Sequence, residues 1–132
     1  MKDRFFKYIH ELQDTITSKL EAIDGFAVFR EDIWKRPEGG GGRTRIIENG
    51  RVFEKGGVNV SGVYGKLPAS MQSYFKVKDV DFFACGLSLV LHPKNPMAPT
   101  VHANWRYFEM YNEKGDIICL LYTSPSPRDE VL

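Results

Sequence analysis

The sequence predicts an α+β fold, in which an N-terminal helix is followed by an antiparallel sheet built from hairpins. Three observations carry this prediction. An apolar stripe of helical period lies near the N-terminus, turn signals separate short alternating segments, and two longer alternating segments lie near the C-terminus. The length of 132 residues, with 42% hydrophobic and 27% charged residues, is typical of one folded domain.

The first predicted element is a helix over residues 3–23. Its apolar side chains recur at spacings of three and four, which places them in one stripe. The stripe consists of Phe5, Ile9, Leu12, Ile16, Leu20 and Ile23. Asp24-Gly25 follows directly and predicts the end of the helix. We expect this helix to pack on the sheet and to carry no chemistry.

Short alternating segments follow the helix. Residues 26–34 predict a strand, and Asn49-Gly50, a strong hairpin signal, predicts a turn within residues 45–53. The later predicted elements are a strand over residues 53–61 with a glycine bulge or bend, a connector or short helix over residues 67–77, and a last hairpin that pairs residues 107–111 with residues 116–118.

Four consecutive glycines, Gly39 to Gly42, are flanked by Lys35-Arg36 and by Arg43-x-Arg45. Such a run costs conformational entropy in a packed domain, so a use is expected. No Gly-Lys-Ser/Thr follows at Walker spacing, and the helix of a dinucleotide site is missing. We expect a mobile loop, and two interpretations stay open: a lid whose cations close on a ligand, or a surface linker without a role.

The most informative segment, Cys85 to Phe108, predicts two strands joined by a proline-rich connector. If these strands pair antiparallel, alternation collects a hydroxyl, two imidazoles, an amide and a guanidinium on one face. These side chains belong to Ser88, His92, His102, Asn104 and Arg106, joined by Thr100, whereas Val101, Ala103, Trp105 and Tyr107 face the other way. The set suits an anionic, hydrogen-bonding ligand. The alternative is the ordinary wet face of a half-buried hairpin.

Composition excludes several classes of protein. The formal net charge of +1 disfavours a nucleic-acid-binding module, which would rest only on the basic glycine run. No apolar run is long enough for a membrane span, and the N-terminus lacks the pattern of a signal peptide. The two cysteines, Cys85 and Cys119, predict no disulfide framework. We expect a cytoplasmic protein.

Several motifs occur in a fixed order along the chain. They are Trp34-x-Arg36, Gly39 to Gly42 with Arg43-x-Arg45, Phe53 to Ser61, Phe82-Phe83-Ala84, Gly86-x-Ser88-Leu89-Val90-x-His92-Pro93-x-Asn95-Pro96 and Pro99-Thr100-Val101-His102-Ala103-Asn104-x-Arg106-Tyr107-Phe108. Together these motifs resemble the N-terminal part of oxygen-dependent coproporphyrinogen III oxidases, over roughly residues 4–118.

The resemblance implies a reaction in haem biosynthesis, the oxidative decarboxylation of two propionates of coproporphyrinogen III to vinyl groups, which gives protoporphyrinogen IX. Molecular oxygen would be the co-substrate, with no organic cofactor. The family fold is a homodimer with a larger antiparallel sheet flanked by helices. Position by position, His102 would be the proton donor, and Ser88, Asn104, Trp105 and Arg106 would contact substrate. His92 and His102 would bind a divalent metal such as manganese, with further ligands in the second half of the family sequence.

The resemblance stops near residue 118, where the family pattern Trp-Trp-Phe-Gly-Gly-Gly is replaced by Cys119-Leu120-Leu121-Tyr122 and then by a Ser/Pro run. We expect residues 1–118 to be the N-terminal part of a coproporphyrinogen III oxidase domain. Residues 119–132 are expected to be a tail foreign to the family and its native coding sequence, with residues 120–132 disordered or loosely packed.

A fragment of this kind is expected to be inactive by itself. The hairpin that carries His102 would keep an unpaired edge, which favours aggregation. The alternative function is a non-catalytic tetrapyrrole- or anion-binding module that uses the same polar face.

Overall fold

The structure, a computed structural model, describes residues 2–76, 80–112 and 114–123. These residues form helix α1 (Lys2–Asp24), the short helix α2 (Ala69–Phe75) and one six-stranded antiparallel sheet. The strands are β1 (Arg30–Lys35), β2 (Gly40–Glu48), β3 (Phe53–Lys66), β4 (Asp81–Pro93), β5 (Val101–Tyr111) and β6 (Ile117–Thr123). Each strand lies beside its neighbour in the sequence, so the predicted α+β fold is confirmed.

The connections between strands explain this sequential order. The Asn49-Gly50 turn joins β2 to β3 as predicted: Asn49 has a positive φ of 56°, and the Gly50 N–H donates to the carbonyl of Phe53 at 2.9 Å. The predicted last hairpin is also confirmed, since Tyr111 pairs with Ile117. The predicted short helix is α2, which lies between β3 and β4.

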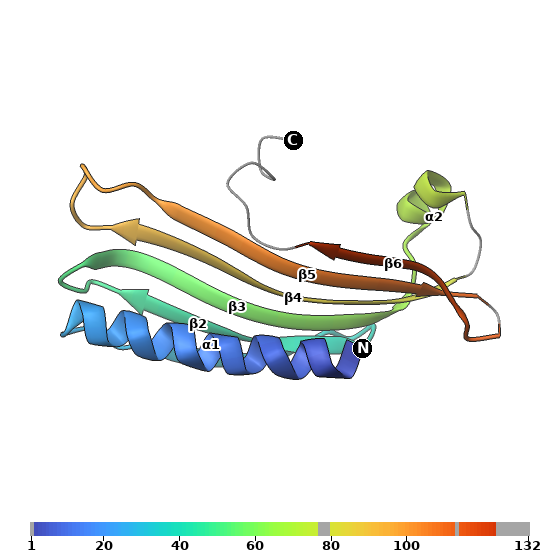
Figure 1. Ribbon diagram of the computed structural model, residues 1–132, viewed down its shortest axis with the longest axis horizontal. Coiled ribbons are helices and arrows are strands. Elements are labelled where there is room, and N and C mark those ends of the chain that lie inside the picture. The colour runs from blue at the N-terminus through green and yellow to red at the C-terminus, as the bar shows by residue number, and fades with distance from the viewer. Residues whose placement is uncertain (1, 77–79, 113, 124–132) are drawn as a thin grey trace.

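Helix α1 closes one face of the sheet, and Figure 1 shows it running along the strands on that side. The core between them consists of Phe5, Ile9, Ile47, Phe53, Val58, Val60, Cys85, Leu87, Leu89, Leu91 and Tyr107. A smaller apolar cluster contains Leu67, Val80, Phe82 and Met110. No helix among the described residues is both long enough and apolar enough to cross a membrane.

The second half of α1 buries polar side chains beside the predicted apolar stripe. Of that stripe, Phe5 and Ile9 are buried, Leu12, Ile16 and Leu20 are partly buried against the core, and Ile23 is 61% exposed. Gln13 and Thr17, which do not belong to the stripe, are also buried. The helix is therefore held on the sheet by hydrogen bonds as well as by apolar contact.

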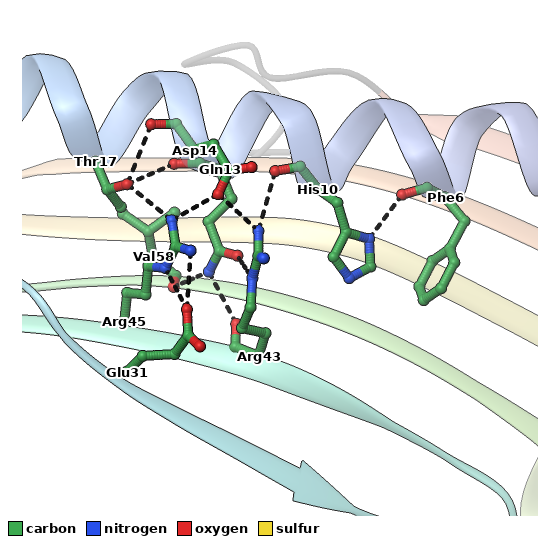
Figure 2. A network of polar contacts seen from close by, with 9 residues as sticks. All are labelled: Phe6, His10, Gln13, Asp14, Thr17, Glu31, Arg43, Arg45 and Val58. Atoms are coloured by element: carbon green, nitrogen blue, oxygen red, sulfur yellow. Dashed lines mark hydrogen bonds and ion pairs between the residues drawn. The ribbon is translucent and has the colours of Figure 1, made fainter.

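Gln13 is completely buried, and its amide is fully used (Figure 2). Its Nε2 donates to the carbonyls of Arg43 and Val58, both at 2.8 Å, and its Oε1 accepts from Nε of Arg43 at 2.6 Å. The Arg43 guanidinium also reaches the carbonyl of His10 and the carboxylate of Asp14. One amide thus connects α1 to both β2 and β3.

Arg45, two residues further along β2, makes a second connection of the same kind. Its guanidinium donates to Oγ1 of Thr17 at 3.0 Å and pairs with the carboxylates of Asp14 and Glu31, both at 2.8 Å (Figure 2). Helix α1, β2 and β1 meet at this side chain. Arg43 and Arg45, two of the four cations that flank the glycine run and that a lid would have carried, are therefore structural.

The expectation of a mobile loop at Gly39 to Gly42 is wrong, because Gly40 to Gly42 belong to β2. Gly41 and Gly42 pair with strands on both sides, and Gly40 pairs with β3. A Cβ atom at Gly42 would lie 2.4 Å from the Trp34 ring and 2.5 Å from the carbonyl oxygen of Val60. Gly40 has a φ of +92°, and a Cβ there would lie 2.1 Å from the carbonyl oxygen of Gly62. Glycine allows these close approaches and does not supply mobility.

Several boundaries differ from the prediction, and β3, for example, ends at Lys66 and not at Ser61. Strand β1 begins at Arg30 and not at Phe26, because the N–H groups of Ala27 and Phe29 are bonded to the carboxylates of Asp24 and Glu21. The expectation of disorder from residue 120 is wrong for residues 120–123, which belong to β6, and residues 124–132 lie outside the described residues.

The edge of the hairpin that carries His102 is partly covered. Strand β6 pairs with β5 from Arg106 to Tyr111, so the expectation of an unpaired edge is wrong for these residues. Within the described part of the chain, residues 101–105 pair with β4 alone.

The carboxylate of Asp24 ties the end of α1 to the β2–β3 hairpin. It accepts four backbone N–H groups, from Ala27, Arg51, Val52 and Phe53, at 2.9 to 3.1 Å. These donors, with Ala27 the largest contributor, hold the pKa of Asp24 well below its ordinary value of 3.8, although burial opposes them.

The first prediction tests the role of glycine in β2. Replacement of Gly42 with Ala should lower the free energy of unfolding by about 1–3 kcal/mol, since the methyl group overlaps the Trp34 ring. Gly57 is the matched control on β3, where a Cβ would lie 3.9 Å from its nearest neighbour, the carbonyl oxygen of Arg45. Gly57→Ala should be neutral or slightly stabilising in urea unfolding. Equal losses in the two variants would contradict this account.

The second prediction concerns Asp24 and pH. The folded-state pKa lies below 3.8, so the ionised carboxylate contributes stability above that pH, and this contribution is lost as the pH falls toward the folded-state pKa. Asp24→Asn should be less stable at neutral pH, because its amide nitrogen would face the N–H groups of Val52 and Phe53. The stability difference between the two proteins should narrow from about pH 5 to about pH 2 in urea titrations. If the stability difference between the two proteins stays constant over this pH range, the ionised Asp24 carboxylate does not stabilise the fold.

Candidate functional site

The sheet face opposite α1 carries a hollow of about 550 Å³. Its polar lining consists of Asn59, Ser61, Ser88, Asn104 and Arg106, and its apolar lining includes Val63, Ala84 and Phe108 of the sheet and Met71 of α2. Figure 1 shows α2 on the side of the sheet away from α1. The hollow therefore lies between α2 and the middle strands.

Strand register builds the polar lining in two rows. In the first row Thr44, Asn59, Ser88 and Asn104 are opposite one another across β2, β3, β4 and β5. In the second row Gly42, Ser61, Gly86 and Arg106 follow the same order. Directly opposed residues of an antiparallel sheet project to the same side, so both rows lie on the face that carries the hollow. The members of each row on β3, β4 and β5 line the hollow. Small side chains in these rows leave a floor on which a broad ligand can lie.

Arg106 is the cation among the residues that line the hollow. Among the described residues, no carboxylate lies within ion-pair distance of its guanidinium, in contrast to Arg43 and Arg45 on the other face. Its stem lies beside Gly86, where a Cβ atom would be 3.4 Å from Cγ of Arg106 and 2.6 Å from the carbonyl oxygen of Trp105. The side chain is exposed, so its charge is available to an anion in the hollow.

The two histidines lie beyond the hollow on the same face. His102 is exposed and pairs with Val90, and its Nε2 is 3.3 Å from Nδ2 of Asn104. His92 is also exposed, near the end of β4, and is the diagonal neighbour of His102 with side chains about 7–8 Å apart. Asn104 therefore connects His102 to the edge of the hollow.

The described residues contain no group of three or more side chains placed to hold a metal ion. Two imidazoles are fewer than the three or four protein ligands of a typical transition-metal site. His92 and His102 therefore do not form a metal site by themselves.

The structure brings together Ser88, Asn104 and Arg106 of the predicted site, but not the side chain of Trp105. Trp105 projects to the α1 side, where it packs against the core cluster with Ala103. A contact of Trp105 with a ligand in the hollow would have to use its backbone. This placement agrees with the alternation of the strand.

The sequence prediction missed the polar side chains supplied by β2 and β3. Asn59 and Ser61 alternate with Val58 and Val60, so the signal was present in the sequence. Recognising it as part of the site required the pairing of β3 with β4, which alternation within one strand cannot give.

The titratable groups beneath the floor are structural. Burial, together with the nearby charge of Glu109, raises the pKa of Cys85 to about 12, so its thiol stays protonated at neutral pH. Burial and a hydrogen bond to Glu109 also raise the pKa of Tyr107 to about 12. The Glu109 carboxylate accepts from Tyr107 at 2.5 Å and from Tyr111 at 2.7 Å. These groups hold the floor and offer no nucleophile to the hollow.

A family model described as coproporphyrinogen III oxidase matches residues 4–120. The chain belongs to this family. It is 53% identical over 116 residues to the chloroplastic oxygen-dependent coproporphyrinogen-III oxidase of Glycine max, which covers 83% of this chain. It is 57% identical over 101 residues, or 75% of this chain, to the oxygen-dependent coproporphyrinogen-III oxidase of Prochlorococcus marinus (strain MIT 9515).

The coproporphyrinogen-III oxidase 1 of Arabidopsis thaliana, also named as chloroplastic, is 50% identical over 116 residues, or 83% of this chain. The chain spans about 30% of the length of each of these three relatives. The hollow, Arg106 and His102 all lie inside the segment that the family model matches.

Proposed function

We propose that the polar sheet face is one wall of the substrate site of an oxygen-dependent coproporphyrinogen III oxidase. The observation that carries this proposal is Arg106, a cation that no carboxylate neutralises among the described residues, at the edge of a hollow lined by amides and hydroxyls. Coproporphyrinogen III has four propionate groups on a tetrapyrrole ring, and such a ligand calls for a guanidinium and neutral hydrogen-bond donors.

The shape of the hollow supports the same ligand. Its volume of about 550 Å³ lies within the range of small-molecule sites, about 300–1,000 Å³. Ser61 and Gly86 keep the floor low, so a macrocycle can approach the sheet closely. Val63, Met71 and Phe108 offer apolar contacts to ring carbons at one end.

We assign each polar residue a different group of the ligand. Arg106 pairs with one propionate, and its planar guanidinium can hold both carboxylate oxygens. Ser88 and Asn104, opposite one another on β4 and β5, donate to a second polar group of the ligand or accept a pyrrole N–H. Trp105 would contribute only through its backbone.

In each propionate, the bond between the side chain and its carboxylate breaks and releases carbon dioxide. The ring-adjacent carbon loses a hydrogen, so a vinyl group forms. The two electrons and one proton released, with one further proton, convert molecular oxygen to hydrogen peroxide. We assign the donation of that further proton to His102. The amide nitrogen of Asn104 can only donate, so Nε2 of His102 accepts from it at 3.3 Å and the proton to be donated is the one on Nδ1.

Three parts of the sequence prediction stay predictions. These are the homodimer, a divalent metal held by His92 and His102, and the cytoplasmic location. The plant relatives are named as chloroplastic proteins, which makes the location a separate question.

Arg106→Lys tests the binding role. The lysine keeps the charge but loses the planar pair of donors, so the dissociation constant of coproporphyrin III, the stable oxidised form of the substrate, should rise about tenfold. Titration of the chain by absorbance gives the constant. Arg4→Lys on α1, away from the hollow, is the matched control and should leave binding unchanged. Equal constants for wild type and Arg106→Lys would contradict propionate recognition at this residue.

His102→Ala tests the chemical role in a full-length protein that carries this segment. Turnover of coproporphyrinogen III should fall by about 10²–10⁴-fold, while cooperative unfolding is retained because the imidazole is exposed. Turnover within twofold of the wild-type protein would remove His102 from the mechanism. Tight binding of coproporphyrin III without any turnover, even in the full-length protein with His102 intact, would favour the non-catalytic module.

A further inference from the structure

A chain of hydrogen bonds crosses three strands on the polar face and ends at the hollow. The indole Nε1–H of Trp34 on β1 donates to Oγ1 of Thr44 on β2 at 3.0 Å. The Thr44 hydroxyl in turn donates to Oδ1 of Asn59 on β3 at 2.6 Å. Asn59 lines the hollow.

The chain fixes which way the Asn59 amide faces. An indole N–H can only donate, so the Thr44 oxygen accepts from Trp34 and keeps its own hydrogen for another acceptor. The separation of 2.6 Å is typical of an O–H···O hydrogen bond and short for an N–H···O hydrogen bond. The carbonyl oxygen of Asn59 therefore faces β2.

The amide nitrogen must then face away from β2. In the part of the chain that the structure describes, Nδ2 of Asn59 has no hydrogen-bond partner, although the side chain is half-buried. Its opposite neighbour on β4 is Ser88, the next member of the polar row. Two N–H donors are thus directed at the floor of the hollow.

We propose that Asn59 is a specificity-determining residue that donates its Nδ2–H to a carboxylate of the tetrapyrrole, and that Thr44 and Trp34 are positioning residues for this donor. The inference rests on the proposed function of the hollow and adds a residue to it. A freely rotating amide would present its oxygen to the ligand part of the time, and an oxygen repels a carboxylate. The hydroxyl of Thr44 prevents that orientation.

Gly42 of β2 supports the hydrogen-bond chain from Trp34 to Asn59. Gly42 leaves the room that the Trp34 indole occupies, since a Cβ there would meet the indole ring at 2.4 Å. From that position the indole nitrogen reaches Thr44, the next residue on the same face of β2. The close packing that excluded a mobile loop therefore also places the first donor of the chain.

Four variants of the chain test the proposal by fluorescence titration with coproporphyrin III. Asn59→Asp keeps the shape and replaces the donor with an anion, and Thr44→Val removes the hydroxyl at constant volume. Each should raise the dissociation constant about tenfold, which is the factor expected when one hydrogen bond to a charged group is lost. Thr44→Ser restores the hydroxyl and should bind like the wild type. Asn112→Asp adds the same charge at the β5–β6 turn and should have no effect.

The tetramethyl ester of coproporphyrin III separates positioning from a general structural role. Its carboxylates are blocked, so Thr44→Val should bind the ester as well as the wild-type chain does. If Thr44→Val weakens binding of the acid and of the ester equally, the proposal is overturned. It is also overturned if Asn59→Asp or Thr44→Val binds the acid within twofold of the wild type, or if Thr44→Ser does not restore binding. If the wild-type chain binds neither ligand, the proposed function of the hollow fails, and this inference falls with it.

Discussion

The buried amide of Gln13 is the contact on which the arrangement depends. It lies where α1, β2 and β3 meet, and it satisfies two strand carbonyls and one arginine at once. A buried amide left without partners would cost about 1–3 kcal/mol, so the helix cannot slide or rotate on the sheet without breaking these bonds. Arg43 and Arg45 extend the same attachment to Asp14 and Glu31. The helix is thereby fixed over one face.

Closure of one face leaves the other face open for a ligand. Because alternation sends neighbouring residues to opposite sides, the strands that bury Val58, Val60 and Leu87 under α1 must present Asn59, Ser61 and Ser88 on the other side. The same register places Arg106 beside the glycine floor. Arginines on both faces pair with carboxylates, Arg43 and Arg45 under α1 and Arg30 with Glu48 on the open face, but among the described residues no carboxylate lies within ion-pair distance of Arg106.

Much of this arrangement follows from local sequence patterns. The helix, the Asn49-Gly50 hairpin and the shared face of Ser88, Asn104 and Arg106 depend on periodicity and turn chemistry, which one segment contains. The glycine run was misinterpreted because its reason lies on other strands, in the Trp34 ring and the carbonyl of Gly62. Asn59 was missed for a similar reason: its role depends on Thr44 and Trp34, which pairing brings beside it. The buried polar contacts of Gln13 and Thr17 could not be predicted either, because the apolar stripe of α1 does not show which strand residues lie beneath the helix.

The central claim is that the face opposite α1 binds a carboxylated tetrapyrrole. Backbone amide chemical-shift mapping of the ¹⁵N-labelled chain with coproporphyrin III tests it most directly. The account predicts shifts that centre on Asn59, Ser61, Ser88, Asn104 and Arg106, with little change at exposed positions of α1 such as Glu11 and Lys19. Shifts that centre on α1 or on the outer edge of β1, with the middle strands unchanged, would contradict it.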